Sequence, residues 1–325
     1  MVQILERRET LEDVIHTVQR RFETLKPVDV DVNLPNYAFD PRGKMPVLAG
    51  PSGNQFHLNK RAQMQFCSRL GIPYEFFSKK CDEAMQAFIA NKLLARGDFR
   101  PTVGRVRTIQ GDVARAILSQ GYNPIDDIDI FPLLAEVLAE EPDLDVQFSR
   151  FDDEYTHVRI LFPRTQMEVK RGDIVQTGIH ISNSEVCLRS VHIDGLIYRL
   201  VCLNGLVTGG KDHSISIVHR TDKDRAIRYI KDTIDSLRPK IQIMMDRFKA
   251  SVNEMPRDPM KTLEATGKLL TKGQLDSVRE SFLQQMDESV FGIINAFTAA
   301  AQKQETAEAR YQMERTGGKL LRIEW

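Results

Sequence analysis

The sequence predicts an α+β protein with a central, mostly antiparallel sheet flanked by helices and a helical C-terminal third. Two observations predict this class. Short runs of alternating apolar and polar residues fill the middle of the chain, where Val175, Thr177, Ile179 and Ile181 share one face. Apolar residues at helical spacing dominate the last third, from Thr221 onward.

Three regions are expected along the 325 residues: an N-terminal arm at 1–57, an α+β core at 58–220, and a helical region at 221–325 packed on that core. In the arm, a helical pattern around Leu11 to Phe22 precedes an extended stretch.

The core is expected to begin with two helices. Asn59 can cap a helix through Leu70, and Pro73 can start a second helix that runs to about Arg96. An acidic helix is expected at about 127–141. The expected strands are 101–109, 112–119, 144–150, 156–162, 173–181, 186–193, 196–203 and 214–219.

Two long helices are expected in the last third. Thr221 and Asp224 resemble a capping box that opens a helix through Pro239 to about Ser251. The second helix is expected at about 272–310.

The composition points to no global partner. Lys and Arg number 45, and Asp and Glu also number 45, so no net charge favours a polyanion or a membrane surface. No apolar run reaches the roughly 18 residues that a membrane span needs, and the N-terminus lacks a signal-peptide pattern. A cytoplasmic location is therefore expected. The four cysteines, Cys67, Cys81, Cys187 and Cys202, form no CxxC pair and are expected to be buried thiols.

Motifs for catalysis, metal binding and cofactor binding are not recognisable in the sequence. The seven histidines are scattered, and the pair of His180 and His192, which could meet across adjacent strands, is interpreted as packing. Gly205 to Lys211 has the spacing of a phosphate loop, but Asp212 stands where such a loop needs Ser or Thr. The sequence therefore predicts no enzyme, no cofactor and no metal.

Several segments carry a family resemblance. They include the Arg115 to Asp126 run, Asn295 to Ala301, and two motifs with Asn183, Ser184, Glu185, Arg199, Cys202, Asn204 and Gly205. Over roughly Leu58 to Leu321 the chain resembles a phage/plasmid-like family catalogued as domain-of-unknown-function family 932. Cys187 stands where that family often has Gly.

The resemblance implies no settled activity. The strand-rich centre flanked by helices is similar in outline to phage single-strand annealing proteins, and members of the family travel on mobile elements. This likeness motivates a nucleic-acid-binding hypothesis.

Charge is segregated along the chain. Residues 92–119 carry six cations against two acids, a net charge of +4, whereas residues 121–155 carry eleven acids against one arginine, a net charge of −10. If Ile109 faces Val113 across a hairpin, then Arg107 lies opposite Arg115, and Arg105 shares their face.

Like charges opposed across strands favour a bridging anion such as a phosphate backbone. The alternative is internal neutralisation by acids of the −10 segment, such as Asp126, Asp127 and Asp129.

Arg199 is expected on a buried face, where a charge needs a partner. Glu185 is the expected partner in a structural interpretation. In the functional interpretation, Arg199 and Arg189 contact phosphate and Lys211 extends a basic edge.

A regular apolar seam is expected on the helix after residue 221. The seam residues are Ile227, Ile230, Ile234, Leu237, Ile241, Met244 and Phe248. The flanking side chains are the cations Lys231, Arg238, Lys240 and Arg247, so an acidic helix is the expected partner. Glu280, Asp287 and Glu288 could provide it within the chain; a helical protein partner or a homo-oligomer is the alternative.

The leading hypothesis is a phage or plasmid protein that binds and anneals single-stranded DNA during recombination or replication. The strands would lie on the face of Arg105, Arg107 and Arg115, without metal or nucleotide. The alternative is a non-enzymatic interaction module that uses residues 221–250 and the acidic 121–155 surface. A third hypothesis is an enzyme with a degenerate phosphate loop at Gly205 to Lys211.

Overall fold

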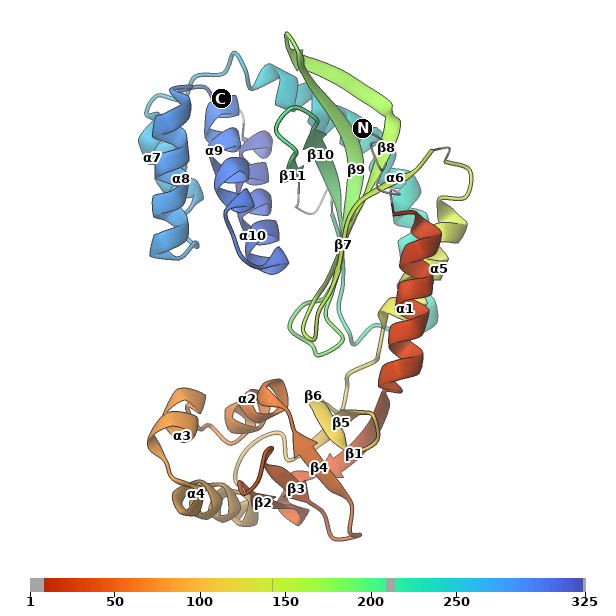
Figure 1. Cartoon of the computed structure of the whole chain (residues 1–325), viewed down its shortest axis with the longest axis vertical. Coiled ribbons are helices and arrows are strands. Elements are labelled where there is room, and N and C mark those ends of the chain that lie inside the picture. Colours follow the sequence, from red (N-terminus) through yellow and green to blue (C-terminus); the bar gives the residue numbers. More distant parts are fainter. Residues whose placement is uncertain (1–8, 142, 209–213, 324–325) are drawn as a thin grey trace, which may run out of the picture. The chain divides into compact units, whose positions relative to one another are not determined.

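The computed structural model describes residues 9–141, 143–208 and 214–323. These residues form two compact units, whose helices and strands are labelled in Figure 1. The small unit holds residues 17–124 and 186–188, and the large unit holds the other described residues. The predicted α+β class is confirmed, but the strands form two six-stranded sheets rather than one.

The small unit contains the first sheet, in the order β1-β5-β6-β4-β3-β2. Only β4 and β6 pair in parallel. Its strands are β1 (Val28–Asn33), β2 (Ala38–Asp40), β3 (Val47–Ala49), β4 (Gln55–Leu58), β5 (Val103–Ile109) and β6 (Val113–Ser119). Residues 28–58, which the sequence analysis assigns largely to an arm, thus supply four strands of this sheet.

Three helices cover the core of the small unit: α2 (Lys60–Arg69), α3 (Tyr74–Lys80) and α4 (Glu83–Arg96). The predicted cap of α2 is confirmed, because Asn59 accepts a hydrogen bond from the amide of Ala62 at 2.8 Å. The single helix predicted from Pro73 to Arg96 is wrong. Asp82 starts α4 as a separate helix by accepting a hydrogen bond from the amide of Met85 at 2.8 Å.

A short 3-10 turn, η1 (Leu34–Asn36), follows β1, and α1 (Leu11–Leu25) has residues in both units.

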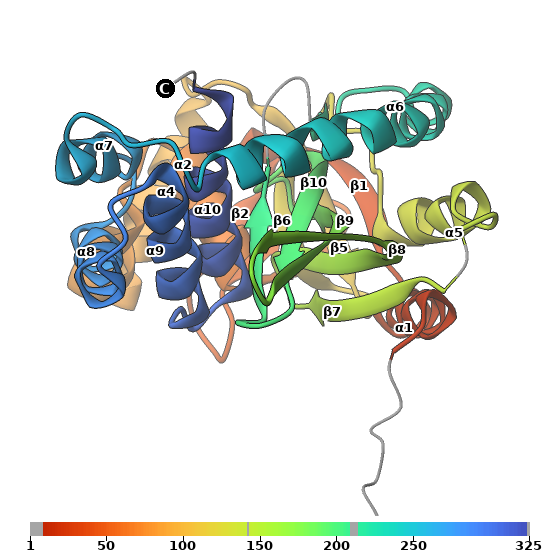
Figure 2. The same cartoon turned by 90° about the horizontal axis from the view of Figure 1, so that it is seen from above.

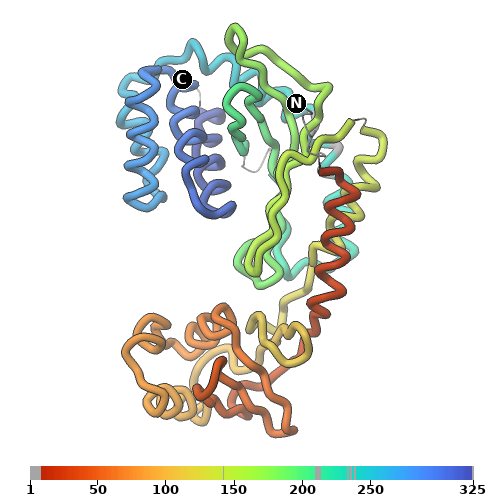
Figure 3. The backbone as a smooth tube through the Cα atoms, viewed as in Figure 1, coloured from red at the N-terminus to blue at the C-terminus, as the bar shows by residue number. Residues whose placement is uncertain are grey.

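The large unit contains the second sheet, in the order β11-β10-β9-β8-β7, with β12 also pairing with β10. Its strands are β7 (Asp145–Phe151), β8 (Thr156–Lys170), β9 (Asp173–Asn183), β10 (Val191–Arg199), β11 (Asn204–Val207) and β12 (Ser214–Ile217). β8 and β9 form a long, curved hairpin (Figure 3). The two strands predicted at 186–193 and 196–203 are one strand, β10, followed by a turn.

α6 (Lys223–Ala250) lies across one face of the second sheet, in contact with β8, β9, β10 and β12 (Figure 2). Its cap is Asp222, one residue after the predicted Thr221, and Asp222 accepts from the amide of Arg225 at 3.0 Å. Apart from the half-buried Ile227, the predicted apolar seam is buried in the unit itself.

The acidic partner of α6 is α5 (Asp127–Val137), not the final helix. Lys223 pairs with Asp129 and Lys231 with Glu136, each at 2.6 Å between Nζ and the carboxylate.

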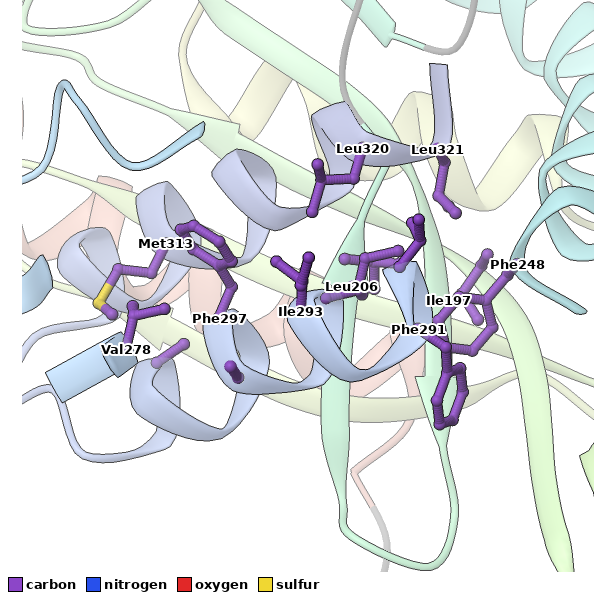
Figure 4. Packing of buried hydrophobic residues seen from close by; sticks show 14 of the residues in the cluster. Ile197, Leu206, Phe248, Val278, Phe291, Ile293, Phe297, Met313, Leu320 and Leu321 are labelled. Carbon is purple, nitrogen blue, oxygen red and sulfur yellow. The ribbon is translucent and has the colours of Figure 1, made fainter. Parts of the chain in front are cut away.

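The single helix predicted at 272–310 is wrong, because three helices, α8 to α10, cover that range, and a further helix, α7, precedes them. These helices are α7 (Pro259–Thr266), α8 (Lys272–Gln285), α9 (Val290–Gln302) and α10 (Ala307–Gly318), followed by the 3-10 turn η2 (Lys319–Arg322). Phe291, Ile293 and Phe297 of α9 pack between Ile197 and Leu206 of the sheet and neighbouring helices (Figure 4).

α10 approaches β11 closely. A Cβ at Gly318 would lie 2.0 Å from the carbonyl oxygen of Val207, so only glycine fits there. This approach sets α10 beside the sheet face that carries the polar network described below.

Two of the four cysteines differ from the expectation. Cys67 and Cys81 are buried, but Cys187 and Cys202 are exposed, and none of the four forms a disulfide.

Among the described residues, no helix has both the length and the apolar character needed to cross a membrane.

Candidate functional site

The hairpin of β5 and β6 carries the three arginines on which the sequence-based site depends. Ile109 does face Val113, as expected. A bulge between Arg107 and Thr108 then shifts the register, so Arg107 faces Ala116 rather than Arg115. The predicted opposition of two arginines is therefore wrong.

These arginines are directed into the small unit. Arg105 donates through Nε to Oδ1 of Asp31 at 2.9 Å and through Nη1 to the carbonyl of Tyr122 at 2.8 Å. Arg107 is only 3% exposed, and its Nη1 donates to the Tyr122 hydroxyl at 3.3 Å. Its Nε lies 3.4 Å from Oδ1 of Asp29.

Arg115 is likewise only 3% exposed. The acids found beside Arg105 and Arg107, Asp31 and Asp29, come from β1, because β1 pairs with β5. The hairpin does not present Arg107 and Arg115 as an open phosphate-binding face.

The other predicted arginines also have internal partners. Arg199 binds Asp173 with both Nε and Nη2, at 3.0 and 2.5 Å, and donates to Oδ1 of Asn295 at 2.8 Å. The predicted Arg199–Glu185 pair is therefore wrong. Arg189 binds Glu308 and stacks on Tyr311, with its guanidinium carbon 4.5 Å from the ring centroid. Lys211 lies outside the described residues.

The small unit is nevertheless strongly basic. Its sequence holds sixteen Lys and Arg against nine Asp and Glu, a net charge of +7, and the rest of the chain carries −7. Lys80, Lys92 and Arg100 are exposed and have no acidic partner among the residues that the structure describes. Their charge is available to solvent.

α4 exposes a stripe that combines apolar and cationic side chains. Ala90 and Leu94 bury one face of the helix. Met85, Phe88, Lys92 and Arg96, which we call the α4 stripe, follow spacings of three, four and four residues and are exposed. Phe88 is 64% exposed, and the Lys92 ammonium lies 5.3 Å from its ring centroid. Phe88 was not among the residues predicted from the sequence, although its helical spacing from Met85 and Lys92 is visible there.

In the large unit, one face of the second sheet is polar. The cross-strand pairs place Ser182 between His157 and His192, and His180 between Arg159 and Asp194. Arg159, His180, Ser182 and Asp194 are at most 3% exposed. His180 faces Asp194 on β10 and contacts His157 on β8, so it does not pair with His192, a contact that the sequence left open.

The hydrogen bonds of this face fix the histidine tautomers. Arg159 Nε donates to His180 Nδ1 at 3.2 Å, and a guanidinium can only donate, so the proton of neutral His180 is on Nε2. That nitrogen lies 3.1 Å from His157 Nδ1, which must accept. His157 Nε2 therefore carries its proton and lies 3.2 Å from Oε2 of Glu308, without the alignment of a full hydrogen bond.

Burial supports the same protonation states. It lowers the pKa of His157 and of His180, so both rings are neutral near pH 7. Burial also raises the pKa of Glu314 to about 7, although the neighbouring Arg159 acts in the opposite direction. Glu314 is fully buried on α10 and binds Arg159.

This network ties α10 to the sheet. Besides Glu308 and Glu314, α10 contributes Tyr311, whose hydroxyl donates to Oδ2 of Asp194 at 2.5 Å. Gly205 of the second motif belongs here, because a Cβ on it would lie 2.9 Å from Nη1 of Arg159. These bonds fix α10 on the sheet.

The Asn-Ser-Glu motif forms a second buried network. Asn183 donates to the carbonyl of Ile125 at 3.1 Å and to Oδ1 of Asp127 at 2.9 Å. Glu185 accepts from the amide of Asp127 at 3.2 Å. The motif thus fixes the start of α5.

No group of three or more His, Cys, Asp and Glu side chains suited to a metal occurs within the described ranges.

Comparison with known proteins gives one match. A family model described as "Domain of unknown function (DUF932)" matches residues 115–320, more than half of the chain. No curated protein and no solved structure matches the chain.

Proposed function

The chain belongs to the family described as domain of unknown function (DUF932), and that description names no activity. From the geometry of the chain itself, we propose that the protein binds single-stranded DNA through its small unit. Most of the small unit precedes the matched residues 115–320. The proposal therefore concerns this chain and not the family as a whole.

The observation that carries the proposal is the separation of charge between the units. A net charge of +7 on about a third of the chain attracts a polyanion, and neutralised phosphates release counterions. The cations without acidic partners, Lys80, Lys92 and Arg100, replace the buried hairpin arginines as the expected phosphate contacts.

The α4 stripe supports a single-stranded ligand. Proteins that hold single strands combine cations along the backbone with aromatic rings on which bases stack. Phe88 provides an exposed ring and Lys92 a cation beside it. Bases of a duplex are not free to stack on such a ring.

The test is binding of a labelled single strand to the full chain over a salt series. The variant Lys80→Gln/Lys92→Gln/Arg100→Gln is expected to bind about tenfold or more weakly. It is also expected to reduce the slope of log K against log salt by about 2, at roughly 0.7 per lost phosphate contact.

The matched control is Arg257→Gln/Lys268→Gln/Lys272→Gln, which removes the same charge from exposed positions of the large unit. The control is expected to bind as the unmodified protein does. Absence of binding at low salt, or an equal loss in the control, would overturn the proposal.

A further inference from the structure

A cavity of about 660 Å³ lies in the large unit, on the polar face of the second sheet. We call it the β7 pocket. Its wall and floor include Gln147, Phe148, Leu161, Gln176, Tyr198 and Leu200. The volume lies within the range of small-molecule sites, roughly 300–1,000 Å³.

Polar groups without protein partners point to a ligand. Gln176 is 7% exposed and Tyr198 is 3% exposed, and both line the pocket. Neither side chain makes a hydrogen bond to any residue of the described chain. Oε1 of Gln147 is buried and also has no hydrogen-bond partner there. A buried polar atom is costly unless bonded, and Oε1 of Gln147 lies beside two further side chains, Gln176 and Tyr198, whose polar groups are available to a ligand in the cavity.

The strands are irregular where they border the pocket. Val146 faces Ile160 and Phe148 faces Arg159, so Gln147 is an extra residue of β7. β8 also shifts register after Phe162. Bulges of this kind redirect side chains beside binding sites. Here the bulge turns Phe148 toward the polar face.

The Phe148 ring makes cation–π contacts with two arginines. The guanidinium carbons of Arg159 and Arg310 lie 5.6 and 5.9 Å from its centroid. A ring fixed in this way can stack on a flat ligand at little entropic cost.

The charges of the side chains that line the pocket disfavour a phosphate inside it. None of the described residues that line it is Lys or Arg, whereas Glu9 and Asp145 are acidic. Carboxylates accept from the amino groups of cytosine, and carboxamides bind the amino edge of adenine. The ligand chemistry is therefore neutral, planar and rich in hydrogen-bonding groups.

We propose that the β7 pocket binds adenine or cytosine, whose exocyclic amino group stands at C6 or C4 of the ring. Phe148 stacks on the base, while Gln147, Gln176, Tyr198 and Asp145 bind its edge. This site goes beyond strand binding by the small unit and does not depend on it. The base could belong to a free nucleoside or to a single strand, and the experiment separates these sources.

The experiment titrates the full chain with adenosine and cytidine, and with thymidine for comparison, at low and high salt. The pocket is expected to bind adenosine or cytidine at least about tenfold more tightly than thymidine. Binding of an uncharged nucleoside is expected to be independent of salt, unlike strand binding by the small unit.

Two conservative variants test the contacts. Gln176→Leu and Tyr198→Phe each remove a polar group and keep the size of the side chain, so the melting temperature should not fall. Each is expected to weaken nucleoside binding about tenfold. Gln284→Leu, at an exposed position of α8, is the matched control and should bind normally.

A short strand of adenines or cytosines distinguishes the source of the base. If only the strand binds, and Gln176→Leu weakens it while Gln284→Leu does not, the base comes from nucleic acid and the proposal holds. If neither ligand responds to Gln176→Leu or Tyr198→Phe, the proposal is wrong. The Lys80→Gln/Lys92→Gln/Arg100→Gln variant should still bind nucleosides, which separates failure of this site from failure of strand binding.

Discussion

The two units of the chain differ in where their charged side chains point. In the small unit, Lys80, Lys92 and Arg100 extend into solvent without acidic partners among the described residues. In the large unit, Arg159, Arg189 and Arg199 are each bound to a carboxylate. An arginine that already has a buried carboxylate cannot gain much from a phosphate, so these three arginines of the large unit are poor phosphate contacts. The abundance of arginine in a sequence therefore says little until each partner is known.

The largest effect is expected at Glu314, which is fully buried against Arg159. At pH 8, above the raised pKa of Glu314, Glu314→Gln keeps the shape but leaves the Arg159 charge without a counterion. We expect the free energy of unfolding to fall by about 3–5 kcal/mol, measured by urea denaturation. Asp143→Asn makes the same change at an exposed pair with Arg164 and should have little effect. Equal effects of both variants would contradict the distinction between inward and outward charges.

The second effect concerns pH. Burial, and next the charge of Glu185, raise the pKa of Asp127 from 3.8 to about 7. Between these values the folded protein keeps a proton that the unfolded chain has lost, so this group makes stability fall as pH rises.

Asp127→Asn removes that dependence. Relative to the unmodified protein, the variant should gain a few kcal/mol of stability between about pH 4 and pH 7, because each pKa unit corresponds to about 1.4 kcal/mol. Denaturation curves across this range provide the measurement. Parallel pH profiles of the two proteins would show that Asp127 is ionised in the folded state throughout.

A smaller effect is expected at Arg199. Arg199→Met leaves the buried carboxylate of Asp173 without its two hydrogen bonds, so stability should fall by about 2 kcal/mol. Arg42→Met, at an exposed pair with Asp40, is the control. If Arg199→Met stayed fully stable and lost strand binding, Arg199 would be a phosphate contact, as the functional interpretation of the sequence had it.

The smallest effect on folding is expected at Phe88. Because its side chain is 64% exposed, Phe88→Leu should change stability by no more than about 0.5 kcal/mol. It should weaken binding of a single strand by about 1–2 kcal/mol, measured by fluorescence anisotropy. Tyr229→Leu, at a half-exposed aromatic residue of α6, should leave binding unchanged.

Local features could be predicted from the sequence. The cap at Asn59, the course of α6 through Pro239 and most strands follow from neighbouring residues alone. Their signals lie within a few positions of the element itself, and tertiary packing did not override them.

Long-range features could not be predicted. The burial of Arg107 depends on β1, and the partners of Arg199 come from β9 and α9. A single bulge moved Arg115 away from Arg107, and one strand pairing placed His157 rather than His192 beside His180. Partner choice of this kind depends on register and topology, which periodicity does not fix.

The most direct test of the central claim is photo-crosslinking of the full chain to a single strand that contains bromodeoxyuridine, followed by mapping of the modified peptides. The proposed function predicts adducts within residues 74–100, which hold α3 and α4, and loss of adducts there in the Lys80→Gln/Lys92→Gln/Arg100→Gln variant. Adducts confined to the large unit, unchanged by that variant, would contradict it.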